Sequence, residues 1–363
     1  MPVRTAFFTI CLFISLTLHA GQPAPAAAPS ETKTGDFQLS FKERSPFSAK
    51  PEMDKRMPYF KAGDYDILAE NFEVYVPTKY KPDLPFGLLV YINSGDDGKC
   101  NGNFKPLLDK YNLIWISANK TGNERAPMHR AGLALDAIHN IRKMYNVDSD
   151  RVYLSGISGG GRCSSGLAPA YPDVFNGVIY LIGCNPMGAK APPQYIDKQK
   201  RLNSYAFMTG TNDMNKPGTN DVLKQYKSLK FERTLYLEVP GMGHDMPPTE
   251  WLEKAINFVD EPLAAAAKLS MKQAQDLEKR EKFGQAILLY RKVAARAQGQ
   301  EMGSEAQAHI EALSKSRNEI LANAKKLIDE KKGSESVATL EKLLRTYETE
   351  AGDVRELLKQ ARK

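Results

Sequence analysis

Residues 152–162 read Val-Tyr-Leu-Ser-Gly-Ile-Ser-Gly-Gly-Gly-Arg, and this stretch decides the fold. It joins an apolar strand to a G-x-S-x-G pattern, Gly156-Ile157-Ser158-Gly159-Gly160. Small residues follow from position 161 to position 168, as at the start of a closely packed helix. Glycines two positions on either side of Ser158 leave room for a sharp turn. The pattern in this context predicts a serine held on a strained strand-to-helix turn.

Apolar runs of strand length recur along the chain and alternate with segments of helical spacing. The runs at 72–76, 86–92, 113–116, 152–154, 178–182, 206–208 and 234–239 predict strands, and 130–145, 221–229 and 249–259 predict helices. This alternation predicts an α/β class fold, a doubly wound and mostly parallel sheet with helices on both faces. Ligands of such sheets bind beyond the carboxyl ends of the strands.

The length of 363 residues allows two domains, and the composition changes near position 263. We expect a catalytic α/β domain over 61–262 and an all-α region of helical hairpins over 263–363. Within the latter, a weak repeat matches positions fifty apart: Ala274, Leu277, Ile287 and Val293 correspond to Ala324, Leu327, Val337 and Leu343. The repeat favours either degenerate tetratricopeptide-type hairpins or a simple helical bundle, and two units are few for a solenoid that stands alone.

The first sixty residues have the features of a targeting signal followed by a linker. Arg4 precedes an apolar run over 6–18, which is too short to cross a bilayer comfortably. We expect a signal peptide over 1–20, cleaved after Ala20 or within 26–28, with an uncleaved anchor as the alternative. Residues 21–60 predict a linker or a poorly ordered lead-in. The mature chain is then exported, to the periplasm or the medium, and has no transmembrane segment.

Cysteine spacing and charge exclude several classes of function. Cys100, Cys163 and Cys184 remain after the signal, so at most one intramolecular disulfide forms, and its pairing is open. No C-x-x-C or H-E-x-x-H pattern is present, and we expect neither a metal nor another cofactor. The net charge of +7 is spread along the chain without an arginine stripe or a stacking platform. We therefore expect no binding to nucleic acid.

The positions of histidines and aspartates after predicted strands point to nucleophilic catalysis by Ser158. A serine hydroxyl needs a base near neutral pKa, and among five histidines only His244 follows the last predicted strand. Asp213 follows the preceding strand and can orient the imidazole, whereas Asp245 is adjacent in sequence and poorly placed to fold back. The chain order serine, aspartate, histidine is that of α/β-hydrolases.

An acyl-transfer site also needs donors for a developing oxyanion. The backbone N–H of Gly159, directly after the serine, is the first candidate. The loop after the 86–92 strand reads Asn93-Ser94-Gly95-Asp96-Asp97-Gly98, and we expect Ser94 or Gly95 to supply the second amide. A plain polar turn is the alternative interpretation of this loop.

Residues 72–260 resemble the catalytic domain of α/β-hydrolases, and within that fold they resemble secreted esterases related to polyhydroxybutyrate depolymerases and feruloyl esterases. The resemblance rests on the elbow around Ser158, on Thr209-Gly210-Thr211-Asn212-Asp213 and on Gly243-His244. It implies hydrolysis of carboxylic esters through an acyl-enzyme, although one fold hosts many reactions. The loop at Ser94 and Gly95 departs from the His-Gly-Gly type of many esterases.

The predicted function is therefore that of an exported serine esterase without a cofactor. The short segment between the 178 and 206 strands suggests an open site, which suits a bulky or polymeric ester. A serine peptidase of the same fold is one alternative. A catalytically inactive scaffold that acts through the helical region is another. That region is also the expected site of any protein partner or self-association.

Overall fold

The computed structural model describes residues 33–60, 64–188, 191–297 and 301–362, so the predicted signal peptide at 1–20 lies outside the described residues. Eight strands form one sheet in the order β1-β2-β4-β3-β5-β6-β7-β8. The strands are β1 Gly35–Leu39, β2 Phe72–Val76, β3 Phe86–Ile92, β4 Leu113–Ala118, β5 Val147–Ile157, β6 Gly177–Leu181, β7 Ser204–Gly210 and β8 Thr234–Val239. β2 runs antiparallel to both of its neighbours, and β3 to β8 are parallel. The predicted sheet is confirmed.

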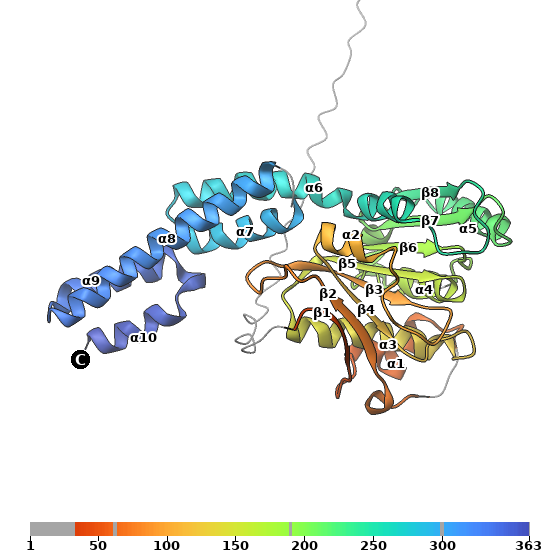
Figure 1. Cartoon of the computed structure of the whole chain (residues 1–363), viewed down its shortest axis with the longest axis horizontal. Helices are drawn as coiled ribbons and strands as arrows, with labels where there is room; N and C mark the ends of the chain where they lie inside the picture. The colour runs from red at the N-terminus through yellow and green to blue at the C-terminus, as the bar shows by residue number, and fades with distance from the viewer. Residues whose placement is uncertain (1–32, 61–63, 189–190, 298–300, 363) are drawn as a thin grey trace, which may run out of the picture.

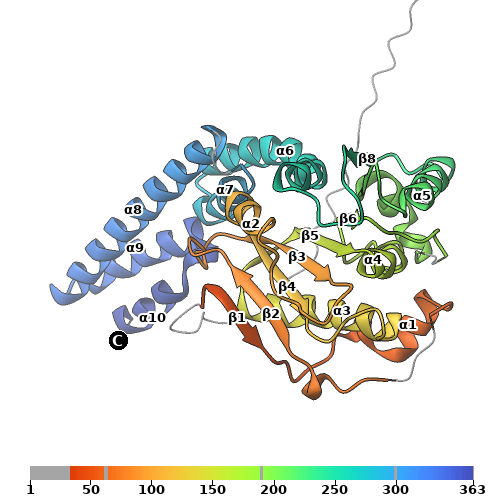
Figure 2. The same cartoon turned by 45° about the vertical axis from the view of Figure 1, so that its right-hand side comes forward.

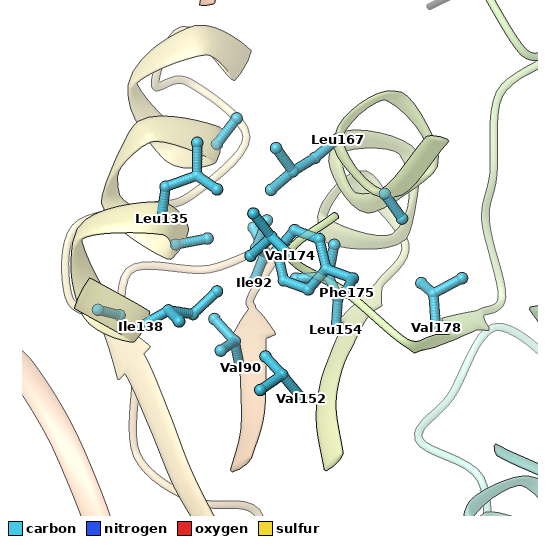
Figure 3. Packing of buried hydrophobic residues seen from close by; sticks show 14 of the residues in the cluster. Val90, Ile92, Leu135, Ile138, Val152, Leu154, Leu167, Val174, Phe175 and Val178 are labelled. Atoms are coloured by element: carbon cyan, nitrogen blue, oxygen red, sulfur yellow. The ribbon is translucent and has the colours of Figure 1, made fainter. Parts of the chain in front are cut away.

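Helices cover both faces of this sheet, as the strand-helix alternation predicts (Figure 1). They are α1 Lys50–Arg56, α2 Lys105–Tyr111, α3 Pro127–Met144, α4 Gly159–Ala170, α5 Lys216–Ser228 and α6 Thr249–Lys279. α3, α4 and α5 bury their apolar side chains in one cluster, and α2 with the first turns of α6 pack on the other face. Figure 3 shows Leu135 and Ile138 of α3 meeting Leu167 of α4 over Val90 and Leu154 of the central strands.

The structure differs from the expected lead-in at 21–60. From Gly35 on, this stretch forms strand β1, which pairs with β2 from Gly35↔Val76 to Leu39↔Phe72, and then helix α1. Apolar spacing is weak here, but buried Phe37, Phe41 and Met53 join the core of the sheet. Tertiary packing stabilises these short elements, which their own propensities did not signal.

The C-terminal region is helical, as predicted. It contains the second half of α6 and helices α7 Phe283–Arg296, α8 Glu301–Asp329, α9 Gly333–Thr346 and α10 Gly352–Ala361. The repeat of fifty residues recurs in backbone geometry. The N–H of Lys282 donates to Leu277 O after α6, and the N–H of Lys332 donates to Leu327 O after α8. Tyr290 of α7 and Leu340 of α9, also fifty apart, are both fully buried. The tetratricopeptide assignment itself stays a prediction.

The two regions are joined by one continuous helix. α6 begins on the sheet and runs through position 262, the expected domain limit, to Lys279, as Figure 1 shows. Pro262 lies within it. The helical region then extends from one side of the α/β domain in both views (Figures 1 and 2).

A buried ion pair fixes the helical region to the start of β5. Arg296 at the end of α7 donates from Nε and Nη2 to Asp148, at 2.7 and 2.8 Å. The two side chains are only 4% and 1% exposed. Asp148 lies at the amino end of β5, so the helical region contacts the end of the sheet opposite to Ser158.

The described residues contain three cysteines. Cys100, Cys163 and Cys184 are free thiols, so no disulfide joins these three cysteines. Among the helices of the described ranges, none combines the length and the apolarity that crossing a membrane requires.

Candidate active site

Ser158 occupies a strained turn directly after β5. Its φ of 52° and ψ of −116° lie where non-glycine residues are rare, and such strain persists only where the surroundings hold it. The serine N–H donates to Leu181 O of β6 at 2.8 Å. A Cβ at Gly160 would lie 1.9 Å from Ile92 O, so the turn requires glycine there to approach β3. The elbow predicted from the sequence is therefore present, with the serine raised above the carboxyl end of the sheet.

A chain of hydrogen bonds joins Ser158 to His244 and Asp213. The His244 Nε2 atom lies 2.8 Å from Ser158 Oγ, and Nδ1 lies 2.8 Å from Asp213 Oδ1. The three residues follow β5, β8 and β7, whose carboxyl ends meet at one edge of the sheet. The tautomer with a proton on Nδ1 leaves Nε2 free to accept the serine proton.

Asp213 is held as a fixed acceptor. Its side chain is fully buried. Oδ2 accepts a hydrogen bond from the hydroxyl of Thr209, and Oδ1 accepts one from the backbone N–H of Asn215. These bonds satisfy a buried carboxylate and leave Oδ1 facing the imidazole. The carboxylate on His244 Nδ1 is that of Asp213 and not that of Asp245, its neighbour in sequence.

A cavity of about 440 Å³ opens beside Ser158. Its lining residues are Phe60, Asn123, Pro127, Arg130, Ser158, Gly159, Arg162, Cys163, Asn185, Met214, Asn215 and His244. Cys163 is buried, and this burial raises its pKa to about 11, so its thiol stays protonated at neutral pH. Of the two potential nucleophiles in the cavity, Ser158 is the one with a base in reach.

The structure brings Gly159 to this cavity but not Ser94 or Gly95. Gly159 opens α4, and the first hydrogen bond of the helix runs from Arg162 N to Ser158 O. The Gly159 amide precedes that bond and so makes no i→i−4 bond in the helix. Neither Ser94 nor Gly95 is among the lining residues, and the Ser94 amide already donates to Asn93 Oδ1 at 2.8 Å.

Asn123 lines the cavity beside Gly159. A Cβ built on Gly159 would stand 1.8 Å from Asn123 Oδ1, which shows how closely this side chain approaches the start of α4. Its backbone N–H donates to Ser94 O, so the two loops are joined. Sequence reasoning missed Asn123 and Arg130. Their position in the sequence could have indicated them, because both follow β4, whose carboxyl end lies at the same edge of the sheet as the elbow.

Nothing among the described residues suggests a resident metal. No group of three or more histidines, cysteines and acidic residues within those ranges is arranged to hold an ion. Ser158 and His244, a nucleophile and a base in hydrogen-bond contact, both line the cavity.

Comparison with known proteins gives similarity to solved structures alone. No protein-family model and no curated protein matches the sequence. Est1E from Butyrivibrio proteoclasticus is 16% identical, with a TM-score of 0.43 over 55% of this chain and 97% of that chain. The esterase Est2 from Thermogutta terrifontis is 15% identical, with a TM-score of 0.41 over 58% of this chain and 93% of that one.

A Bacteroides ovatus protein described as a dipeptidyl aminopeptidase IV is 13% identical, with a TM-score of 0.41 over 53% of this chain. The match spans 33% of the length of that protein. Strand order, the elbow and the order of Ser158, Asp213 and His244 identify the α/β-hydrolase fold.

Proposed function

We propose that this chain is a serine hydrolase that cleaves carboxylic esters, with Ser158, His244 and Asp213 as its catalytic triad. The observation that carries the proposal is the unbroken chain of hydrogen bonds from Ser158 Oγ through the imidazole to Asp213. Nucleophile, base and orienting group have the spacing that serine catalysis requires. The strained turn supports it, because strain of this kind gathers at functional sites.

The proposed reaction has two halves. His244 Nε2 takes the proton of Ser158 as Oγ forms a bond to the ester carbonyl carbon. The tetrahedral intermediate then breaks its bond to the alkoxy oxygen, which leaves as the alcohol with the proton from His244. Water repeats the sequence on the acyl-enzyme, so that a carboxylic acid leaves and Ser158 regains its proton. Asp213 stabilises the imidazolium in both halves.

The oxyanion has one donor from the elbow and a second from a neighbouring loop. We assign the first to the Gly159 amide, at the start of α4. For the second we favour the side-chain amide of Asn123 over the backbone of Ser94 or Gly95, because Asn123 lines the cavity. Asn123→Ala then lowers kcat by about 10²-fold or more. Equal activity in this variant returns the role to the Ser94–Gly95 loop.

Two other functions use the same features differently. A serine peptidase would share the triad, and nitroanilide substrates beside nitrophenyl esters distinguish the two. An inactive scaffold would keep the fold and act through α6 to α10. Bulky or polymeric esters remain proposed substrates. Much faster turnover of soluble short-chain esters than of polymers would count against this proposal.

Labelling with a fluorophosphonate, paired with a nitrophenyl ester assay, tests the proposal. We expect labelling at Ser158 and a loss of about 10⁶-fold in kcat for Ser158→Ala. Ser155→Ala is the matched control, because this buried serine of β5 donates to Ile179 O of the neighbouring strand β6 and does not line the cavity. Folded protein that neither labels nor turns over any ester contradicts the proposal.

Export is a separate proposal, supported by the apolar run at 6–18. Mass spectrometry of the N-terminus of the protein from its native cells tests it. A mature chain beginning at residue 21, or just after 26–28, is the expected result. An intact N-terminus in the cytosolic fraction contradicts it.

A further inference from the structure

Arg130 presents a buried positive charge to the cavity of Ser158 and has no ion pair. It lies on the first turn of α3, it lines the cavity, and it is only 4% exposed. Its Nη2 donates to the backbone oxygen of Asn93 at 2.6 Å. The Nε atom is buried and has no hydrogen-bond partner within the described residues.

Other buried arginines of the chain are treated differently. Arg56, Arg151 and Arg296 also have buried side chains, and each forms an ion pair. Arg56 pairs with Asp173 at 2.7 Å, and Arg151 pairs with Asp260 at 2.8 Å. Burying a guanidinium without a carboxylate costs free energy that packing alone does not return. Burial also lowers the pKa of Arg130 below its ordinary value.

The charged side chains that line the cavity around Arg130 are cationic. A second cation, Arg162, lines it, is exposed, and donates to Asn215 Oδ1 at 2.8 Å. No ion pair of Arg162 occurs among the described residues, and none of the described residues that line the cavity is an aspartate or a glutamate. An anion entering the cavity therefore meets two cations and no competing carboxylate.

We propose that Arg130 binds a carboxylate carried by the ester substrate, so that the enzyme prefers esters of a dicarboxylic or hydroxycarboxylic acid that retain one free carboxylate. This inference rests on the proposed function and specifies its substrate class. A guanidinium offers N–H donors in a fixed fork, which suits a carboxylate better than the ammonium of lysine does. The carboxylate supplies the counter-charge that Arg130 lacks among the described residues that line the cavity. Arg162, at the exposed side of the cavity, adds attraction during entry.

Two matched substrate pairs test the inference. Mono-4-nitrophenyl adipate against 4-nitrophenyl hexanoate places the carboxylate on the acyl side. 4-Acetoxybenzoate against 4-methylphenyl acetate places it on the alcohol side. The measured quantity is kcat/KM for the charged ester divided by kcat/KM for its neutral partner. We expect this ratio to exceed one in wild-type protein for at least one pair.

Arg130→Gln should lower that ratio roughly 10- to 100-fold, which is the size of a lost charge-assisted hydrogen bond. Arg130→Lys should recover part of the loss. Arg125→Gln is the matched control: Arg125 lies in the preceding loop, pairs with Glu70 and does not line the cavity. Its ratio should equal that of wild type. Thermal unfolding identifies any variant that fails to fold, and Arg130→Lys then provides the comparison.

Each result has one meaning. If kcat/KM fell equally for neutral and charged esters in the Arg130 variants, Arg130 would be assigned to positioning the Asn93 loop, and the inference would be overturned. A wild-type preference for the neutral ester in both pairs overturns it without any variant. In either case, turnover of neutral esters and labelling of Ser158 leave the proposed esterase function standing. Loss of both labelling and turnover in wild-type protein would instead remove the esterase function itself.

Discussion

The charged side chains at the two ends of β5 differ in whether they form ion pairs. At its amino end, Asp148 accepts two hydrogen bonds from Arg296, and Asp150 accepts a third. Past its carboxyl end, Arg130 and Arg162 line the cavity of Ser158, and no aspartate or glutamate of the described residues lines it with them. One end therefore satisfies its charges internally and holds the helical region in place.

The difference indicates which charges hold the fold and which await a ligand. A buried ion pair with both partners present is an internal structural element, and removing one partner leaves a buried charge uncompensated. Arg130 is a buried cation without an ion pair among the described residues, and we propose that its partner is the substrate. We call the amino end of β5, at Asp148, the architectural end, and its carboxyl end, before Ser158, the reactive end. Variants at the architectural end should affect stability, and variants at the reactive end should affect catalysis.

The largest effect is expected at the reactive end. Asp213→Asn should lower kcat on a nitrophenyl ester by about 10⁴-fold, because the amide no longer holds the productive imidazole tautomer. Thermal unfolding should change little. Asp245→Asn is the control, since the imidazole of His244 is hydrogen-bonded to Asp213 and not to this neighbour. A fall of similar size in Asp245→Asn would show that the wrong carboxylate has been assigned.

At the architectural end, stability should fall while catalysis persists. Arg296→Ala leaves Asp148 buried and unpaired, which costs about 3–5 kcal/mol in the free energy of unfolding. Urea denaturation and limited proteolysis of α7 to α10 measure it. Arg291→Ala removes a more exposed pair with Glu350 inside the helical region and should cost less. Loss of ester turnover in folded Arg296→Ala would break the separation between the two ends.

Alanine substitutions at two glycines, one in the elbow and one in the helical region, should change stability in opposite directions. Gly160→Ala puts a Cβ against the backbone of Ile92 and should destabilise the elbow by about 1–3 kcal/mol, with loss of activity. Gly333→Ala, at the start of α9, meets no atom closer than 3.6 Å. It should stabilise the protein by about 0.5 kcal/mol, since alanine loses less backbone entropy than glycine. Calorimetry of both variants would show whether these opposite signs hold.

Stability should also depend on acid at the amino end of β5. Burial opposes the charge of Asp148, but the hydrogen bonds and charge of Arg296 outweigh it and hold the pKa of Asp148 below its ordinary 3.8. A carboxylate with a lowered folded pKa stabilises fully above its unfolded pKa and loses this contribution as pH falls through the folded one. The docking of the helical region should therefore weaken only below about pH 4, by about 1.4 kcal/mol per unit of lowering.

Asp148→Asn provides the comparison for this acid dependence. It removes the titrating group, so the variant should be less stable than wild type near neutral pH and converge with it in strong acid. Urea denaturation over a pH series measures the gap between the two proteins. A gap that stays constant through acid would show that Asp148 does not titrate with folding.

Much of the α/β domain follows from local sequence. The apolar runs that become β2 to β8 are long or continuous enough to mark strands, and the glycines around Ser158 specify the turn. The order of Ser158, Asp213 and His244 after successive strands predicts the hydrogen-bonded chain, because parallel strands bring their carboxyl ends to one edge. β1 and α1 escaped prediction because their stability comes from packing against β2 and the core rather than from their own pattern.

The sequence by itself determined the elbow, the parallel sheet and the helical repeat of fifty residues, because each depends on the spacing of residues close together in the chain. Only the tertiary structure decided that Asn123 lines the cavity while Ser94 and Gly95 are not among its lining residues, that Arg296 reaches Asp148, and that Arg130 forms no ion pair among the described residues. The physical reason is that burial and charge pairing depend on which distant elements meet. A single arginine in a sequence looks the same whether its carboxylate lies in the protein or in the substrate.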